Sequence, residues 1–134
     1  MPDTEVVARL RQVLAGRKDV RVAVLFGSEA RGTARAGSDV DVAVEAPGAD
    51  ILELAVALSE ALSREVDVVS LDDATIPLLE QLVRDGIVVH EAYPGAGALW
   101  RSHVLTSLET DRPWFARMRD AWLARVRERG LSRG

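Results

Sequence analysis

The stretch VRVAVLFGS, residues 20–28, followed after ten residues by DVD, residues 39–41, decides the fold of this chain. Apart from Arg21, residues 20–26 are apolar and rich in β-branched side chains, and a run of this length is typical of a buried strand. Gly27 and Ser28 then predict a tight turn, where the missing Cβ lets the main chain approach a ligand and a hydroxyl lies beside backbone N–H groups. We expect this turn to hold phosphate oxygens.

Two acidic residues lie two positions apart in the second stretch. On a strand, Asp39 and Asp41 project from the same face, with their Cα atoms about 6.6 Å apart. Adjacent unpaired carboxylates repel each other, and a divalent cation removes that repulsion. Mg²⁺ takes one or two carboxylates and fills its other positions with water and substrate phosphates. The spacing therefore predicts a site for a metal-bound nucleoside triphosphate.

A third carboxylate interrupts an apolar run at VDVV, residues 66–69. We expect a buried strand here. If it pairs beside the strand of Asp39 and Asp41, Asp67 faces the same ions, and three acids are enough to hold a metal pair about 3.5–4 Å apart for in-line nucleotidyl transfer. Taken alone, the glycine-serine pair is more often an ordinary turn, and Asp39 and Asp41 are more often the polar face of an edge strand. Asp67 alone is more often a buried acid with hydrogen-bond partners. Together and in this order, they favour a nucleotide site.

The composite pattern resembles the signature of the polymerase-β-type nucleotidyltransferase superfamily. Its short form resembles the minimal nucleotidyltransferases, the antitoxin partners of HEPN-domain toxins. The likeness covers roughly residues 20–91 and rests on FGSEARG, residues 26–32, and GSDVDVAV, residues 37–44. It implies an α/β (α+β) fold of the polymerase-β type, in which a small mixed sheet is flanked by helices and followed by C-terminal helices.

The resemblance also implies how the site works. Asp39, Asp41 and Asp67 would be the catalytic, metal-binding residues for two Mg²⁺ ions, and Asp67 is also a candidate proton acceptor. Gly27 and Ser28 would bind the terminal phosphates of ATP. The chain would then contribute placement and electrostatics more than covalent chemistry.

Two neighbouring residues are further candidates for nucleotide binding. Arg31 lies three residues after Ser28 on a predicted short helix, from which its guanidinium either reaches triphosphate oxygens or pairs with Asp39 or Glu29. Ser38 directly precedes Asp39, and we expect it to orient that carboxylate.

By the same resemblance, the donor is ATP and the acceptor is a tyrosine on a cognate HEPN ribonuclease toxin, which AMP addition silences. The chain would act as the antitoxin and form a hetero-oligomer with the toxin. Two alternatives stay open. One is a non-catalytic antitoxin that neutralises the toxin by direct complex formation. The other is a small-molecule adenylyltransferase of the aminoglycoside-resistance type, which is disfavoured because such enzymes use a second substrate-holding domain and only about two helices are predicted after residue 91.

Composition sets further limits. The 134 residues suit about one domain, and 48% of them are hydrophobic. The absence of cysteine excludes disulfides and thiolate metal sites. No apolar run approaches the roughly 18 residues of a membrane span and the N-terminus is acidic, so we expect a cytoplasmic protein without membrane contact. The net charge of −4 argues against direct nucleic-acid binding.

Hydrophobic periodicity and capping residues predict the remaining elements. Helices are expected between residues 4 and 16, over 51–62 with Asp50 as its cap, and over 76–85, with a last strand at 87–89. Asp72 and Asp73 are interpreted as capping residues of the third of these helices rather than as metal ligands.

A break at PGAG, residues 94–97, divides a minimal nucleotidyltransferase domain, 1–93, from a C-terminal helical extension, 94–134, that packs on the domain or on a partner. Residues 111–134 carry seven arginines and three acids, a net charge of +4, whereas the first 110 residues carry −8. Pro113 is predicted to open a helix with one apolar stripe. The stripe suits either the chain's own core or an interface with another protein. Its members are Trp114, Phe115, Met118, Trp122 and Val126.

Overall fold

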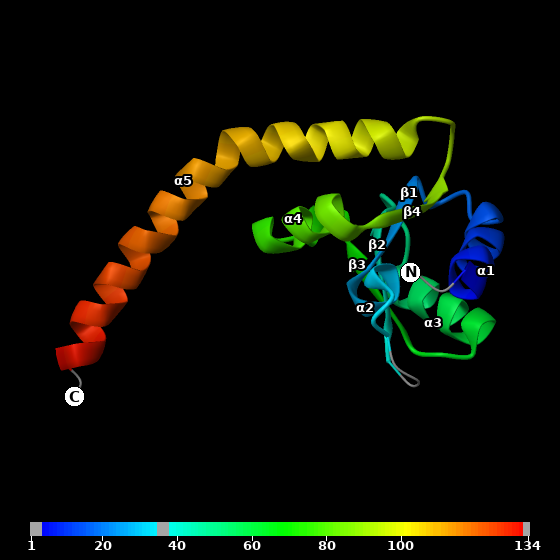
Figure 1. Cartoon of the computed structure of the whole chain (residues 1–134), viewed down its shortest axis with the longest axis horizontal. Coiled ribbons are helices and arrows are strands. Elements are labelled where there is room, and N and C mark those ends of the chain that lie inside the picture. Colours follow the sequence, from blue (N-terminus) through cyan, green and yellow to red (C-terminus); the bar gives the residue numbers. More distant parts are fainter. Residues whose placement is uncertain (1–3, 35–37, 133–134) are drawn as a thin grey trace.

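The structure is a computed structural model that describes residues 4–34 and 38–132, except the side chains of 111–120, 122, 123, 126 and 128–132. Helices and strands alternate along most of the chain (Figure 1). The elements are α1 (Thr4–Ala15), β1 (Val22–Phe26), α2 (Gly27–Arg31), β2 (Val40–Glu45), α3 (Ile51–Leu62), β3 (Val66–Ser70), the 3₁₀ turn η1 (Leu71–Asp73), α4 (Ile76–Asp85), β4 (Ile87–Glu91) and α5 (Ala96–Ser132).

The four strands form one mixed sheet in the order β3-β2-β1-β4. β1 runs antiparallel to both of its neighbours, β2 and β4, whereas β2 and β3 are parallel. A parallel pair requires a crossover connection, and α3 provides it. The predicted α/β class with a small mixed sheet is confirmed. The strand of Asp67, expected to be buried, is instead one of the two outer strands of the sheet, and Asp67 is exposed.

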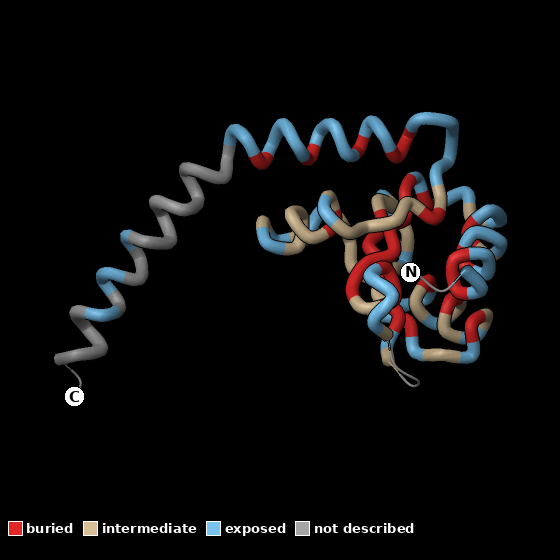
Figure 2. The backbone as a smooth tube through the Cα atoms, in the orientation of Figure 1, coloured by how far each residue is buried: buried red, intermediate tan, exposed pale blue. Residues whose placement is uncertain are grey.

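Helices cover both faces of this sheet (Figures 1 and 2). α1 and α3 pack on the face that Ala23 and Leu25 of β1 present, and α4 and α5 pack on the face of Val22 and Val24. Because alternate residues of a strand point to opposite faces, a central strand covered on both sides must be apolar throughout. All five residues of β1 are accordingly buried.

Side-chain oxygens cap two helix starts, and one of these caps, Asp50, was predicted. The Asp50 side chain accepts a backbone N–H bond at the start of α3, at 3.1 Å. At the start of α4, the Thr75 hydroxyl does the same at 3.3 Å. The interpretation of Asp72 and Asp73 as caps of α4 is wrong, since both lie in η1 and Thr75 occupies the cap position.

The C-terminal region is one continuous helix, α5, from Ala96 to Ser132. The prediction that Pro113 opens a separate helix is therefore wrong. A proline inside a helix removes one backbone hydrogen bond and favours a kink, and Figure 1 shows α5 bending along its length. None of the helices in the described part of the chain combines the length and the apolar character needed to cross a membrane.

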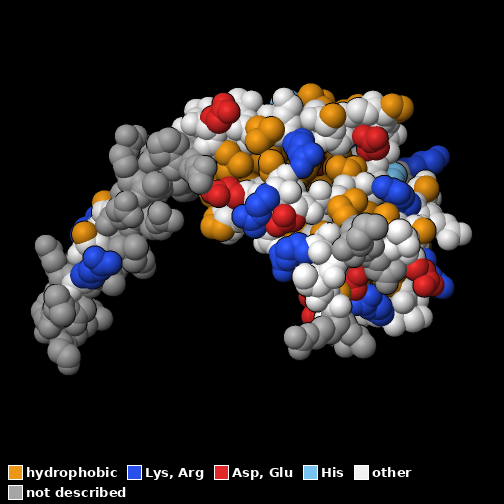
Figure 3. Space-filling model, in the orientation of Figure 1, with side chains coloured by type: hydrophobic (Ala, Val, Ile, Leu, Met, Phe, Trp, Pro, Cys, Tyr) orange, Lys and Arg blue, Asp and Glu red, His pale blue; other side chains and the backbone are white. Residues whose placement is uncertain are grey.

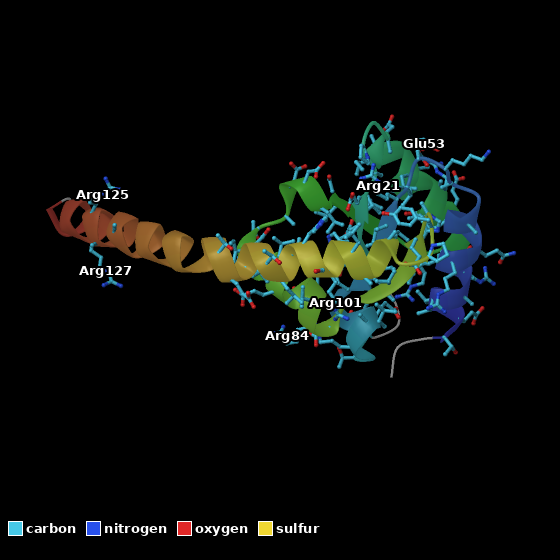
Figure 4. The ribbon with its side chains drawn as sticks, turned by 90° about the horizontal axis from the view of Figure 1, so that it is seen from above. Arg21, Glu53, Arg84, Arg101, Arg125 and Arg127 are labelled. Carbon is cyan, nitrogen blue, oxygen red and sulfur yellow. The ribbon has the colours of Figure 1, made fainter. Side chains whose placement is uncertain are left out.

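The first part of α5 belongs to the core of the domain. Trp100, Val104 and Leu108 recur every fourth residue and are buried against the sheet and α4. Figure 3 shows hydrophobic side chains along the region between α5 and α4, and the Arg101 guanidinium (Figure 4) donates to the Val83 carbonyl of α4.

The far part of α5 extends beyond the sheet (Figure 1), and Arg125 and Arg127 on it are exposed (Figure 4). The stripe expected on this part lies outside the described side chains; it consists of Trp114, Phe115, Met118, Trp122 and Val126.

Candidate active site

The parallel pairing of β2 and β3 brings two of the predicted carboxylates together. Asp41 is the register partner of Asp67, and Val40 is the partner of Val66. Asp39 directly precedes β2 and lies next to this pairing. Strand alternation places Asp41 on the same face as Ala43, which packs toward α4 and α5. The carboxylates therefore lie at one end of the sheet, on the face that α5 covers.

A fourth acidic residue, Glu65, belongs to this group and was missed by the sequence analysis. Oxygen atoms of Asp39, Glu65 and Asp67 lie within 4.8 Å of one another, and all three side chains are exposed. Glu65 and Asp67 are two positions apart, the same spacing that singled out Asp39 and Asp41, and this spacing was the available signal. A set of carboxylate oxygens is the type of ligand that Mg²⁺ prefers, so these residues fit the metal that the sequence predicts.

Asp41 is turned toward the glycine-serine turn rather than into the trio of Asp39, Glu65 and Asp67. Gly27 opens α2 with a φ of +75°, and a Cβ built on it would lie 2.6 Å from Asp41 Oδ2. A side chain at this position would have to displace the Asp41 carboxylate. Gly27 thus meets two requirements, a left-handed backbone and direct contact with a carboxylate. The predicted turn and the predicted acids are adjacent in the structure.

The surroundings of Asp41 disfavour its charged form. Burial raises the pKa of the Asp41 carboxyl, and the nearby Asp67 and Asp39 carboxylates raise it further, while Arg31 opposes the shift. The charges of Asp39, Asp67 and Arg31 thus all act on the Asp41 carboxyl. An added cation would supply the positive charge that Arg31 provides only in part.

The other predicted residues surround this group. Ser28 is half-buried within α2, and its carbonyl accepts the Thr33 N–H at 2.9 Å. Arg31, the last residue of α2, is exposed. The suggested pairing of Arg31 with Glu29 is not found, because Glu29 pairs with Arg64 instead. Ser38 is half-buried directly before Asp39.

Replacing Asp41 with asparagine is expected to stabilise the metal-free protein at neutral pH. A carboxyl whose pKa is raised in the folded state binds its proton more tightly there, so ionised Asp41 opposes folding increasingly as pH rises above about 4. Asp41→Asn removes this penalty. The melting temperature with a chelator present should exceed that of the wild type at pH 7, and the difference should shrink toward acid pH. Asp73→Asn, an exposed acid in η1, is the control. A lower melting temperature for Asp41→Asn at pH 7 would contradict the expectation.

A glycine-serine turn beside carboxylates on neighbouring strands of a small mixed sheet defines the class of nucleotidyltransferases with the polymerase-β type of fold. The chain belongs to the polymerase beta nucleotidyltransferase family, whose model matches residues 8–94. The resemblance stated from the sequence is thereby confirmed.

One relative among characterised proteins is the protein adenylyltransferase MntA of Shewanella oneidensis. It is 44% identical over 68 residues, which cover 46% of this chain and 48% of the relative. The match thus spans about half the length of that protein.

Solved structures give a broader match. A crystal structure of a toxin-antitoxin with AMP-PNP has a TM-score of 0.68 and 26% sequence identity, covering 87% of this chain and 98% of that chain. A complex of tri-AMPylated Shewanella oneidensis HEPN toxin with MNT antitoxin has a TM-score of 0.58 and 24% identity, covering 89% and 94%. At that identity, the second match shows the fold alone. AMP-PNP, an ATP analogue, is part of the first of these two structures.

Proposed function

We propose that this chain transfers AMP from ATP to a tyrosine of a HEPN-type toxin and so acts as its antitoxin. The observation that carries the proposal is the pairing of Asp41 with Asp67 directly beside Gly27, in a member of a nucleotidyltransferase family. The name of the 44% identical relative, a protein adenylyltransferase, and the AMP-PNP in the 26% identical toxin-antitoxin structure support AMP transfer to a protein.

Asp39, Asp41 and Asp67, together with Glu65, would hold two Mg²⁺ ions. The oxygen ligands and the crowding of negative charge around Asp41 support this assignment. When bound, such ions neutralise charge on the triphosphate and lower the pKa of the attacking hydroxyl.

The chain's own residues bind and orient the reactants. Gly27 and Ser28 receive the terminal phosphates, and the Arg31 guanidinium faces the triphosphate from the end of α2. The tyrosine oxygen forms a bond to the α-phosphorus of ATP. The bond from that phosphorus to the oxygen it shares with the β-phosphorus breaks, and pyrophosphate leaves with this oxygen. The tyrosine proton passes to the Asp67 carboxylate. Ser38 orients Asp39 from the preceding position. The cytoplasmic location expected from the sequence remains a prediction.

The test is to incubate the chain with ATP, Mg²⁺ and the product of the neighbouring gene, and to measure the intact mass of that product. The proposal expects the mass to increase by one or more AMP groups, with the adduct on a tyrosine. Full neutralisation of the toxin without any adduct would refute the proposal and favour the second candidate, a non-catalytic antitoxin that acts by complex formation. That candidate is favoured by one observation, the extension of α5 beyond the sheet.

We further propose that the far part of α5 binds the partner protein, so that residues 94–134 serve both the core and an interface. Removing everything after residue 97 would strip Trp100, Val104 and Leu108 from the core. A chain ending at residue 110 keeps them and lacks only the far part.

The chain ending at residue 110 should keep a melting temperature near that of the full chain. Its affinity for the partner should fall about 100-fold, because aromatic and arginine side chains dominate interface energies. Titration calorimetry measures this affinity. A shortened chain that melts normally and binds the partner as tightly as the full chain would contradict the assignment.

A further inference from the structure

Glu29 is an unusual residue for its position. It is 3% exposed and, within the described residues, is the charged side chain that the structure buries. Its carboxylate pairs with Arg64, with 2.5 Å between Oε1 and Nη1. A buried charge is retained only with a partner of opposite charge. The pair links α2, which carries the glycine-serine turn, to the segment that enters β3.

Arg64 also binds the segment that carries Asp39. Its second nitrogen, Nη2, donates to the Ser38 carbonyl at 2.6 Å. One residue after Asp39, the Val40 N–H donates to the Glu65 carbonyl at 3.0 Å. Asp39 lies just outside β2, yet the backbone is held on both of its sides by residues 64 and 65. The fork of the guanidinium supplies one of these two attachments.

A single side chain thus connects the three segments that form the site. The Arg64 guanidinium pairs with Glu29 of α2 and binds the Ser38 carbonyl next to Asp39. The backbone of Arg64 continues directly into Glu65 and Asp67. We propose that Arg64, held by Glu29, is a positioning residue that sets the separation of the carboxylates for metal binding. This inference rests on the proposed function, because it assigns these carboxylates to the metal.

Arg64→Lys tests the inference. Lysine keeps the positive charge for Glu29 but lacks the planar fork that contacts two partners at once. The dissociation constant of the Arg64→Lys variant for Mn²⁺ is measured on the full chain by electron paramagnetic resonance. It should rise about 10- to 100-fold, the effect expected when a residue that orients metal ligands is lost. In AMP transfer, kcat should fall by a similar factor while the KM for ATP stays within about twofold of the wild type.

The control is Arg21→Lys. Arg21 (Figure 4) pairs through Nη1 with Glu45 Oε1 at 2.7 Å. Glu45 lies at the opposite end of β2 from Asp41. This variant should bind Mn²⁺ and transfer AMP as the wild type does. If Arg64→Lys also binds Mn²⁺ within about twofold of the wild type, or if Arg21→Lys shows the same loss, the inference is overturned.

A second variant provides the test if Arg64→Lys does not fold. Glu29→Met combined with Arg64→Met replaces the ion pair with apolar side chains of similar size, an exchange that buried pairs often tolerate. It should fold and show the same weak Mn²⁺ binding as Arg64→Lys; wild-type Mn²⁺ affinity in the folded double variant would overturn the inference. Mn²⁺ binding needs no partner protein. A wild type that binds Mn²⁺ but transfers no AMP would therefore refute the proposed function and leave the role of Arg64 standing.

Discussion

Replacing both Asp39 and Asp41 with asparagine is expected to lower the rate of AMP transfer at least about 10³-fold. Effects of this size follow when a group that stabilises charge is removed from an active site. The double change deletes the Asp39 carboxylate from the exposed group with Glu65 and Asp67, and also the half-buried Asp41 carboxylate beside Gly27. Both changes keep the size of the side chain. Single-turnover transfer to the partner, followed by intact mass, measures the effect.

The matched control is Asp72→Asn combined with Asp73→Asn, which changes two exposed acids in η1. It should transfer AMP at the wild-type rate. The chain with both Asp39→Asn and Asp41→Asn should fail to neutralise the toxin when the toxin is in molar excess. Without catalysis, one such chain can inactivate at most the one toxin molecule that it binds. Undiminished transfer by this chain would place the chemistry elsewhere in the molecule.

Alanine at Gly27 is expected to lower both stability and activity. A φ of +75° costs a residue with a Cβ about 1–2 kcal/mol, or roughly 4 °C in melting temperature per kcal/mol for a chain of this size. The added methyl also collides with Asp41 Oδ2, which the ideal Cβ approaches to 2.6 Å. Displacing that carboxylate by about 1 Å should lower kcat about 100-fold.

Gly48→Ala separates these two causes. Gly48 has nearly the same φ, +79°, but a Cβ there meets nothing within 4 Å. Both variants should therefore melt lower than the wild type, while only Gly27→Ala loses activity. Melting temperatures and kcat values of the two proteins decide the matter. Equal activity losses in both variants, or full activity in Gly27→Ala, would show that contact with Asp41 does not matter.

The sequence predicts local features of the fold well because local chemistry determines them. Asp50 indicates the start of α3 through its capping oxygen. The run at residues 20–26, apolar except for Arg21, indicates a buried strand. Pro113 shows the limit of such reasoning. Its preference for the first turn of a helix is real, but α5 begins at Ala96 and continues through the proline.

The sequence indicated the candidate acids and suggested that their strands pair, but it indicated neither the register of that pairing nor the ion pair beside it. Asp39, Asp41 and Asp67 stand out because acids interrupt apolar runs, whereas the register that pairs Asp41 with Asp67 depends on contacts far apart in the sequence. The ion pair of Glu29 with Arg64 joins residues 35 positions apart. No periodicity marks such a pair, so only the folded structure shows it.

The position of β3 as an outer strand has a consequence for the protein in solution. An outer strand presents unpaired backbone groups that can template the addition of a strand from another molecule, and charged side chains hinder this. β3 is otherwise mostly valine, and Asp67 supplies its negative charge, with Glu65 directly before it. Asp67 and Glu65, which are proposed to bind the metal, thus also hinder aggregation through β3. Substitutions that neutralise them should lower the solubility of the chain as well as remove metal ligands.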